Sequence, residues 1–599
     1  MALVRLKSLS TLNNNNLEAK NFDLYRLLCS QELLTIAYNS IKSKPGNMTP
    51  GTDGKTLDGL SEEVLDKLMS DLRDQSFQFS PVLRVYIPKG NSGKLRPLGI
   101  PPPREKIVHK GMLMILEAIY DPTFSEHSHG FRSGRSCHTA LREFRTTWRS
   151  TAWAIEGDIK GCYDNVDHTT LINIIRRKVA DERFIRLIWK MLRAGIIEDG
   201  KYSPTTVGTP QGGIVSPLLS NIYLNELDVF IGQIQDLTCA YTGNLPRKDN
   251  PEYSKIKRKI YRLRRERDSP KDTESKKRIN TQVIMLSKAL RQLPSTDPND
   301  PKFIRIKYVR YADDWVVGIT GSMDFTKFIL SLIDEFIKNV LKMELSSEKT
   351  VITKFSSGKV RFLGYFIKIG SVSTNSLNKN STKKRTVGHN PRLFAPSQQL
   401  VRKLYENNFC THEGRGVRKK GWIYYPDEII VQRYNSIIRG YRNYYAPADN
   451  FSTTMSRIEY ILLFSCAHTL ASKHRTRVST QIRRLKRELK LSISKTYTNN
   501  LWDFRPNQEK ISIDRIYSFY VKRTKLLSSD KCIICKSTDR LESHHVRALR
   551  KDGVNLHDKY FIGVMQRMNR KQITVCRNCH QKIHNGLYDG ISLQTLPGT

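Results

Sequence analysis

The chain has 599 residues, enough for three or four domains of typical size. Hydrophobic residues make up 39% and aromatic residues 9%, so the composition supports packed cores and excludes wholesale disorder. Lys and Arg number 100 against 57 Asp and Glu, a formal charge of +43 that runs along the whole chain and favours a polyanionic partner such as nucleic acid.

The sequence predicts neither a membrane protein nor a secreted one. No segment approaches the roughly 18 apolar residues of a membrane-spanning helix, and no anchor or lipidation motif supports a membrane-surface protein. The first dozen residues, with Arg5 and Lys7, are too short and weak for a signal peptide, and an organelle-targeting role for them stays open. The ten cysteines form no disulfide framework. We therefore expect an intracellular location, in a bacterial cytoplasm or in an organelle.

The first half of the chain mixes helices with short strands. Apolar spacing predicts helices within residues 17–75, interrupted by a loop at 45–54. Two strands joined by a Gly/Ser turn follow at 82–100. We then expect a helix at 105–120, a strand at 152–159, one or two helices at 170–193 and a helix at 217–229.

The second half is more basic. Residues 240–300 are highly charged, and the sequence leaves a solvated insertion and a nucleic-acid contact equally open there. The pattern predicts a helix at 323–340, a strand at 360–367 and a polar linker at 371–390. Residues 395–490 read as mostly helical and very basic, and 491–525 are mixed; no internal repeat is evident.

Two adjacent carboxylates, Asp313 and Asp314, lie at the tip of an apparent hairpin. Residues 307–310 and 315–319 flank them and are rich in β-branched and aromatic residues, so each flank is typical of a strand. Like charges about 4 Å apart repel by roughly 4 kcal/mol at an effective dielectric of about 20. Divalent cations relieve this repulsion, and hard oxygen ligands suit magnesium. Alone, the pair is more often a solvated turn.

A third carboxylate and a glycine-rich turn change that interpretation. Asp158 closes an apolar strand, the place from which a metal-binding carboxylate emerges into a cleft. Residues 208–213 form a Gly-rich turn ahead of a helix, where backbone N–H groups can approach a phosphate closely. Alone, this turn is a weak signal. Six short motifs follow one another along the chain: Leu95-Arg96-Pro97-Leu98-Gly99-Ile100-Pro101; His129-Gly130-Phe131-Arg132 with Ser136-Cys137-His138; Gly157-Asp158-Ile159-Lys160; Gly208-Thr209-Pro210-Gln211-Gly212; Tyr311-Ala312-Asp313-Asp314; and Phe362-Leu363-Gly364-Tyr365.

In this order, the motifs resemble the reverse transcriptase palm, and specifically the proteins encoded by group II introns, over roughly residues 20–370. The resemblance implies template-directed DNA synthesis by two-metal phosphoryl transfer. By position, Asp158, Asp313 and Asp314 would bind two Mg²⁺ ions. The implied nucleotide-binding residues are Lys89 and Arg96 at the triphosphate, Gln211 in the pocket, and Tyr163 at the place of the aromatic that excludes a ribose 2′-hydroxyl. Tyr163 is a mild departure, since many relatives have Phe there.

Residues 390–490 resemble the thumb, or maturase, domain of the same family, on the segments 434–445 and 470–474. Tyr and Arg interleaved at this density suit phosphate contact and base stacking, although an amphipathic helix with core aromatics gives the same pattern. The resemblance implies binding of the host intron RNA, which supplies the splicing chemistry itself. The candidate RNA-binding residues are Arg439, Tyr441, Arg442, Tyr444 and Lys473.

Four cysteines near the C-terminus stand in two CxxC pairs, Cys532 with Cys535 and Cys576 with Cys579. Two such knuckles can close a tetrahedral zinc site that stabilises a segment too short for its own core. An isolated CxxC could instead be redox-active, but two of them beside a histidine cluster favour structural zinc.

The histidines around these pairs resemble an HNH nuclease finger, which also ends many group II intron proteins. By that resemblance His545 is the general base, and His544, His580 and His584 hold one catalytic divalent cation; His580 and His584 are four apart and share a helix face. One position departs from the family, because Lys571 stands where the motif has Asn, and Asn569 lies two residues earlier. The departure puts the positioning of the base in doubt.

The sequence therefore predicts a multidomain α+β protein with right-hand polymerase fingers and an antiparallel palm sheet, a helical thumb and a small zinc-bound ββα-metal finger. The expected parts are an N-terminal helical extension (1–80), fingers and palm (81–370), thumb or maturase domain (371–490), DNA-binding region (491–525) and HNH domain (526–599). The expected function joins reverse transcriptase, maturase and a DNA endonuclease that nicks the target strand to prime synthesis during intron mobility. The expected partners are the host intron RNA, target DNA and dNTPs. Two alternatives stay open: a splicing factor with vestigial enzyme sites, and a reverse transcriptase of another genetic element.

Overall fold

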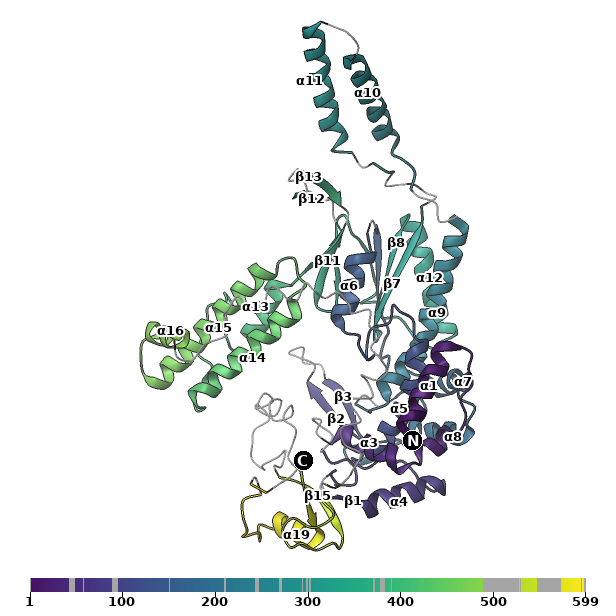
Figure 1. Ribbon diagram of the computed structural model, residues 1–599, viewed down its shortest axis with the longest axis vertical. Helices are drawn as coiled ribbons and strands as arrows, with labels where there is room; N and C mark the ends of the chain where they lie inside the picture. The colour runs from purple at the N-terminus through teal and green to yellow at the C-terminus, as the bar shows by residue number, and fades with distance from the viewer. Residues whose placement is uncertain are drawn as a thin grey trace.

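The structure is a computed structural model of the chain (Figure 1). It describes residues 2–42, 49–57, 59–88, 95–149, 151–209, 212–242, 247–268, 272–293, 295–297, 300, 303–369, 372–377, 383–388, 390–487, 527, 529–546, 572–593, 595 and 596. At 372–377, 383–388, 486 and 487 the description covers the backbone alone.

The described part of the N-terminal region, residues 2–73, is mostly helical; the apolar spacing predicts helices within 17–75, and α1 lies ahead of that range. Its elements are α1 (Ala2–Asn15), α2 (Leu24–Leu28), α3 (Gln31–Ile41), the short strand β1 (Leu60–Ser61) and α4 (Glu62–Arg73). The Ser30 and Ser61 side chains begin α3 and α4 by accepting hydrogen bonds from Leu33 N and Val64 N. Helices α1 and α3 pack on α5 (Glu105–Tyr120), which has the bounds that its sequence predicts.

A small sheet follows in the order β3-β2-β5-β6. Its strands are β2 (Val82–Pro88), β3 (Leu95–Ile100), β5 (Ile196–Glu198) and β6 (Lys201–Ser203). Strand β2 is antiparallel to β3 and parallel to β5. The predicted pair of strands at 82–100 is confirmed, and its turn lies outside the described residues.

The central sheet is fully antiparallel, with the order β7-β8-β4-β9. Its strands are β4 (Trp153–Asp158), β7 (Arg305–Tyr311), β8 (Asp314–Thr320) and β9 (Val351–Lys354). The helices that share its main hydrophobic core are α5, α7 (His168–Arg176), α8 (Glu182–Leu192), α9 (Ser216–Thr242) and α12 (Met323–Asn339). This core also takes in helices α1–α4, so the N-terminal region and the central sheet share one interior.

A second core joins a three-stranded sheet to a group of helices. The strands are β10 (Val360–Phe362), β11 (Tyr365–Ile369) and β14 (Pro391–Phe394), and the helices are α6 (Cys137–Thr147), α13 (Ser397–Glu406), α14 (Asp427–Tyr445), α15 (Phe451–His474) and α16 (Val478–Arg487). Figure 1 shows α13–α16 extending to one side of the central sheet. Short 3₁₀ turns lie at Asp121–Thr123 and Lys420–Trp422.

Two predictions for this part are wrong. The strand expected at 360–367 is two strands, because Leu363 (φ 47°) and Gly364 (φ 73°) are both left-handed and turn the chain back. The linker expected at 371–390 contains an antiparallel hairpin, β12 (Val372–Leu377) with β13 (Lys383–Gly388). Its Ser, Asn, Lys and Thr composition carries no hydrophobic alternation from which strands could be predicted.

The charged segment after α9 is a helical hairpin, α10 (Pro251–Asp268) with α11 (Thr273–Leu290). It projects from the rest of the molecule at the top of Figure 1. Its own small seam is Ile260, Ile279 and Val283, and most of its other side chains are exposed. The segment is an exposed helical insertion, which is compatible with both alternatives that the sequence leaves open, a solvated insertion and a nucleic-acid contact.

The C-terminal part contains a small unit that we call the Cys/His module: residues 529–546 and 572–593, with β15 (Leu541–His545), β16 (Gln572–Cys576) and α19 (Arg577–His584). Strand β1 of the N-terminal region joins its sheet, whose order is β1-β15-β16. Figure 1 shows the module beside β1 and α4. Among the described helices, none combines the length and apolar character needed to cross a bilayer.

Candidate functional site

The Asp313–Asp314 hairpin forms as the sequence predicts. Strand β7 ends at Tyr311 and β8 begins at Asp314, so Ala312 and Asp313 make the turn. Ala312 is left-handed, with φ 56°. The turn therefore needs a residue without a branched side chain there, which Ala supplies.

The third carboxylate lies beside this hairpin. In the β4–β8 pair, Asp158 is the direct cross-strand partner of Asp314, at the ends of both strands. Directly opposed residues in an antiparallel pair hold their Cβ atoms about 5 Å apart. The fold thus gathers Asp158, Asp313 and Asp314 at one end of the central sheet.

The electrostatics of this end fit a cation site. Burial, followed by repulsion from Asp158, raises the pKa of Asp313 above its usual range. The ammonium of Lys349 donates to Asp158 Oδ2 at 2.7 Å, and this hydrogen bond raises the pKa of Lys349, with further contributions from Asp313 and Asp314. Two positive groups, Lys349 and Arg96, act on Asp313, and the three carboxylates form an oxygen donor set that suits Mg²⁺.

A buried ion pair between β7 and α9 supports the hairpin. The side chains of Arg310 and Asp228 are fully buried and joined at 2.6 Å. The Arg310 guanidinium also donates to the carbonyl of Ala312 in the turn, at 2.9 Å, and to Asn221 Oδ1 at 3.0 Å. Tyr308 donates to Asp228 as well. These bonds fix the turn to α9.

A glycine backs the same turn. A Cβ on Gly130 would lie 2.3 Å from Ala312 N, far inside any allowed contact. The Asn221 side chain donates to Gly130 O at 2.8 Å, and His129 N donates to Arg310 O at 2.9 Å. The motif around Gly130 therefore holds the Asp313–Asp314 hairpin by close backbone approach.

On the nucleotide side, Arg96 of β3 is exposed and Tyr163 is half-buried. Arg96 and Asp313 both influence Tyr163. Burial and then Asp313 raise the pKa of Tyr163, and Arg96 opposes this shift. Gly208, at φ 88°, lies so close to Asp164 that a Cβ would meet Asp164 O at 2.7 Å. The remaining predicted nucleotide residues, Lys89 and Gln211, lie outside the described residues.

The four predicted zinc ligands converge. Within the Cys/His module, the sulfur atoms of Cys532, Cys535, Cys576 and Cys579 all lie within 4.8 Å of one another, and all four are free thiols. A backbone hydrogen bond at Ser537 is the main cause that lowers the pKa of Cys535 to about 7. A thiol that ionises readily among three others fits a tetrahedral zinc site.

Three of the predicted histidines also converge. Ligand atoms of His544, His580 and His584 lie within 4.8 Å of one another, and Nε2 of His580 and Nε2 of His584 are 3.0 Å apart. Glu542 Oε2 lies 2.5 Å from His580 Nδ1. A carboxylate behind a histidine fixes the tautomer that leaves the opposite nitrogen toward a metal, so this cluster fits a cation as well.

His545 does not join that cluster. It follows His544 on β15, and successive strand residues point to opposite faces. Its Nε2 lies 2.8 Å from the side-chain nitrogen of Gln572, and the residue is 4% exposed. Asn569 and Lys571, where the sequence departs from the nuclease motif, lie outside the described residues.

The predicted RNA-binding residues differ in exposure. Arg439 is exposed on α14. The others are engaged within the fold: Arg442 pairs with Glu459 at 2.5 Å, Lys473 pairs with Asp427 at 2.7 Å, and Tyr444 donates to Leu363 O at 2.7 Å. Tyr441 stacks on Tyr445.

Three further residues of the site were not identified from the sequence. Lys349 stands in a polar segment with no pattern around it. Arg310 did carry a signal, because a charged residue inside an apolar strand requires a buried partner. That partner, Asp228, lies 82 residues away on α9. Only the fold brings the two together.

Comparisons with known proteins agree with this geometry. The reverse transcriptase (RNA-dependent DNA polymerase) family matches residues 87–242, and the type II intron maturase family matches residues 388–524. The group II intron-encoded protein LtrA of Lactococcus lactis subsp. cremoris is 35% identical, over 96% of this chain and 98% of LtrA. The COX1/OXI3 intron 2 protein of Saccharomyces cerevisiae is 37% identical, over 98% of this chain and 69% of the yeast protein.

The chain is therefore a reverse transcriptase with a type II intron maturase domain, and it belongs to the family of group II intron-encoded proteins. A reverse transcriptase domain implies a divalent metal such as Mg²⁺. The maturase domain implies binding to intron RNA.

Proposed function

We propose that Asp158, Asp313 and Asp314 form the polymerase site, as ligands of two Mg²⁺ ions. The observation that carries this proposal is the cross-strand pairing of Asp158 with Asp314 at the turn that holds Asp313. When bound, the two ions would hold the attacking 3′-oxygen and the leaving pyrophosphate in line. The chain positions the carboxylates through Arg310, and Lys349 lies beside them as a cation that can meet the leaving phosphates.

The nucleotide would bind between this site and β3. Arg96 and Lys89 would meet the triphosphate, Gln211 would line the pocket and Tyr163 would exclude a ribose 2′-hydroxyl. The shared electrostatic environment of Arg96, Tyr163 and Asp313 supports these roles for the described residues. In domain terms, residues 81–370 would be fingers and palm, 371–490 the thumb, and 1–80 a helical extension.

The C-terminal part, 526–599, would be a DNA endonuclease of the HNH type. Its four cysteines would hold a structural zinc ion, and His544, His580 and His584 would hold one catalytic cation. His545 would activate water. An antiparallel pair of strands, β15 and β16, followed by a helix that carries two of the histidines supports this assignment. The nick would then supply the primer for reverse transcription during intron mobility.

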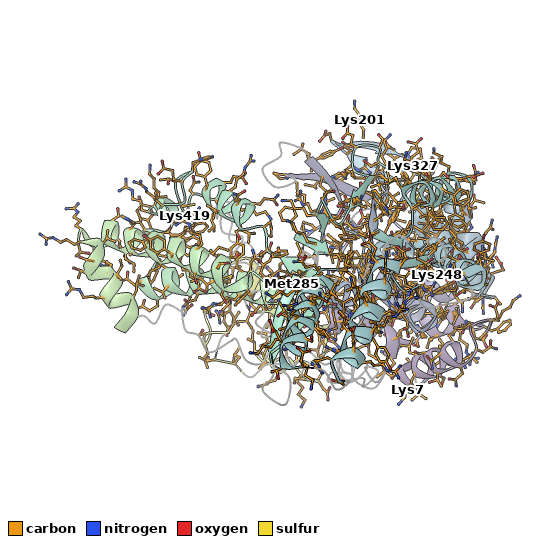
Figure 2. The ribbon with its side chains drawn as sticks, turned by 90° about the horizontal axis from the view of Figure 1, so that it is seen from above. Lys7, Lys201, Lys248, Met285, Lys327 and Lys419 are labelled. Atoms are coloured by element: carbon orange, nitrogen blue, oxygen red, sulfur yellow. The ribbon has the colours of Figure 1, made fainter. Side chains whose placement is uncertain are left out.

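The RNA partner would be the host intron, bound through basic residues of the thumb such as Arg439, and residues 491–525 would contact DNA. Figure 2 shows Lys7, Lys201, Lys327 and Lys419 on different parts of the molecule, so lysine side chains are not confined to one patch. Relatives include a nuclear intron maturase of Arabidopsis thaliana whose name places it in mitochondria, at 21% identity over 79% of this chain. A bacterial or organellar location would suit both kinds of relative.

The polymerase proposal is tested by primer extension on an RNA template with Mg²⁺. Asp313→Asn should reduce extension by about 1000-fold or more, since it removes a metal ligand whose charge stabilises the transition state. The matched control is Asp167→Asn. Asp167 is a nearby carboxylate that caps α7 through Thr170 N and pairs with Lys342, and Asn also caps helices well. It should retain activity within about threefold.

A protein with vestigial enzyme sites would give no extension with any variant, while still promoting splicing of its intron. Equal losses in Asp313→Asn and Asp167→Asn would contradict the assignment of the metal ligands.

A further inference from the structure

The Cys/His module is attached to the N-terminal region by a strand. β1 pairs with β15 through Leu60 with Ser543 and Ser61 with Glu542, and Gly59 N donates to Ser543 O at 3.2 Å. Gly59 also lies against the histidine cluster, since a Cβ there would be 2.9 Å from His580 Cε1. The join is only two residue pairs long, which is short enough to separate without unfolding either part.

A second contact lies at the other strand of the module. Lys42, at the end of α3, donates through its ammonium to Gln572 Oε1, and the Gln572 amide nitrogen is 3.3 Å from the Tyr38 hydroxyl and 2.8 Å from His545 Nε2. All four side chains are buried: Lys42 is 7% exposed, His545 4%, Gln572 2% and Tyr38 0%.

The donors and acceptors of this contact have one consistent arrangement. A lysine ammonium can only donate, so the oxygen of the Gln572 amide must face Lys42. Its nitrogen, which can only donate, then faces His545, so Nε2 of His545 is the acceptor. The orientation of the amide thus follows from Lys42. In this arrangement Nε2 of His545 accepts from Gln572, its cross-strand neighbour on β16, and Lys42 and Tyr38 of the N-terminal region hold that amide in place, so this nitrogen is not open to a water on DNA.

This inference rests on the proposed nuclease function, in which His545 activates water. We propose that docking of the Cys/His module on β1 and α3 is an autoinhibitory contact, which keeps His545 away from DNA until the module separates from the N-terminal region. Lys42 is the central residue of the contact, because it holds Gln572 in the orientation that engages His545. The polymerase site lies outside the contact and works in both arrangements.

The experiment uses the full-length protein and supercoiled plasmid DNA with Mg²⁺, where a single nick produces the open circle. Lys42→Met removes the ammonium and keeps the length of the side chain. It should accelerate nicking roughly tenfold, the change expected in a docking equilibrium after loss of one buried, charge-assisted hydrogen bond. Tyr38→Phe, which keeps the buried ring, should give a smaller increase. Lys67→Met removes an exposed lysine of α4 and should change nothing.

Two further measurements make the outcomes distinct. Hydrogen exchange of the amides in 541–545 should become faster in Lys42→Met if the module undocks. Primer extension should match the wild type in every variant, which reports that the N-terminal region is folded. Faster exchange together with unchanged or slower nicking would overturn the autoinhibitory contact.

Loss of the proposed function gives a different result. If His584→Ala leaves nicking intact in the wild-type and Lys42→Met backgrounds, the nuclease assignment is wrong and the inference fails with it. The same holds if no variant nicks DNA. Nicking that requires His584 but does not respond to Lys42→Met would remove the inference alone.

Discussion

At the scale of single residues, the proposed polymerase site depends on close backbone approach as much as on its carboxylates. The turn that holds Asp313 is left-handed at Ala312 and has Gly130 directly behind it. The space there is smaller than a methyl group. A substitution at Gly130 therefore changes the position of the carboxylates without removing any of them.

Gly130→Ala should reduce primer extension by about 100-fold, because displacement of the turn by roughly 1 Å moves the metal ligands out of line. Gly232→Ala is the matched control, since no atom lies within 4 Å of a Cβ at that helical position. It should behave as the wild type in the same steady-state assay. Full activity in Gly130→Ala would show that the turn is not held from this side.

The sequence predicts some of these residues better than others. Asp313 and Asp314 are adjacent and stand between two strand-like segments, so the hairpin is readable from local pattern. Asp158 is identified by its place at a strand end. Lys349 is not predictable, because its contact with Asp158 joins positions 191 residues apart across the sheet. The resemblance to the maturase domain predicts RNA binding by Lys473 and Arg442, but it does not reveal their pairing with Asp427 and Glu459.

At the scale of elements, the buried pair of Arg310 on β7 and Asp228 on α9 joins the central sheet to its longest covering helix. Each side chain is fully buried, and their hydrogen bonds extend to Tyr308, Asn221 and the Ala312 carbonyl. An ion pair removed from water is costly to break on one side only, because the remaining charge has no solvent.

Asp228→Asn should therefore destabilise this part of the protein by about 3 kcal/mol or more. In calorimetry, the melting temperature of the largest transition should fall by about 5–10 °C. Lys338→Met breaks an exposed helical ion pair with Asp334 and should lower it by less than about 2 °C. The double variant Arg310→Met/Asp228→Leu should lose less stability than Asp228→Asn, and a larger loss would contradict the charge argument.

Element prediction succeeds where a hydrophobic period is strong. The helix at 105–120 and the two strands at 82–100 are confirmed. The hairpin at 372–388 has a polar composition, and the turn at Leu363 and Gly364 lies inside an apolar run. In both cases pairing with another strand decides the structure, and pairing partners leave little trace in local sequence.

At the scale of the whole molecule, the buried side chains of the described residues form four separate hydrophobic clusters. The first and second share the β7–β8 hairpin, the second also joins α6 to the maturase helices, the third is the Cys/His module and the fourth is the α10–α11 seam. The pairing of β1 with β15 joins Leu60 to Ser543, 483 residues later in the chain. Composition predicts the polyanionic partner, but it cannot predict that the two ends of the chain share a sheet.

The most direct measurement of the whole account is synthesis of DNA from a nick that the protein makes itself. The protein is assembled with its host intron RNA and mixed with a DNA duplex that joins the flanking exons, Mg²⁺ and labelled dNTPs. We expect labelled DNA covalently attached to the nicked strand. The His584→Ala variant should give no product on the intact duplex but should give it on a duplex nicked in advance. The Asp313→Asn variant should give no product on either duplex. Attached product from His584→Ala on the intact duplex, or from Asp313→Asn on either, would contradict the account.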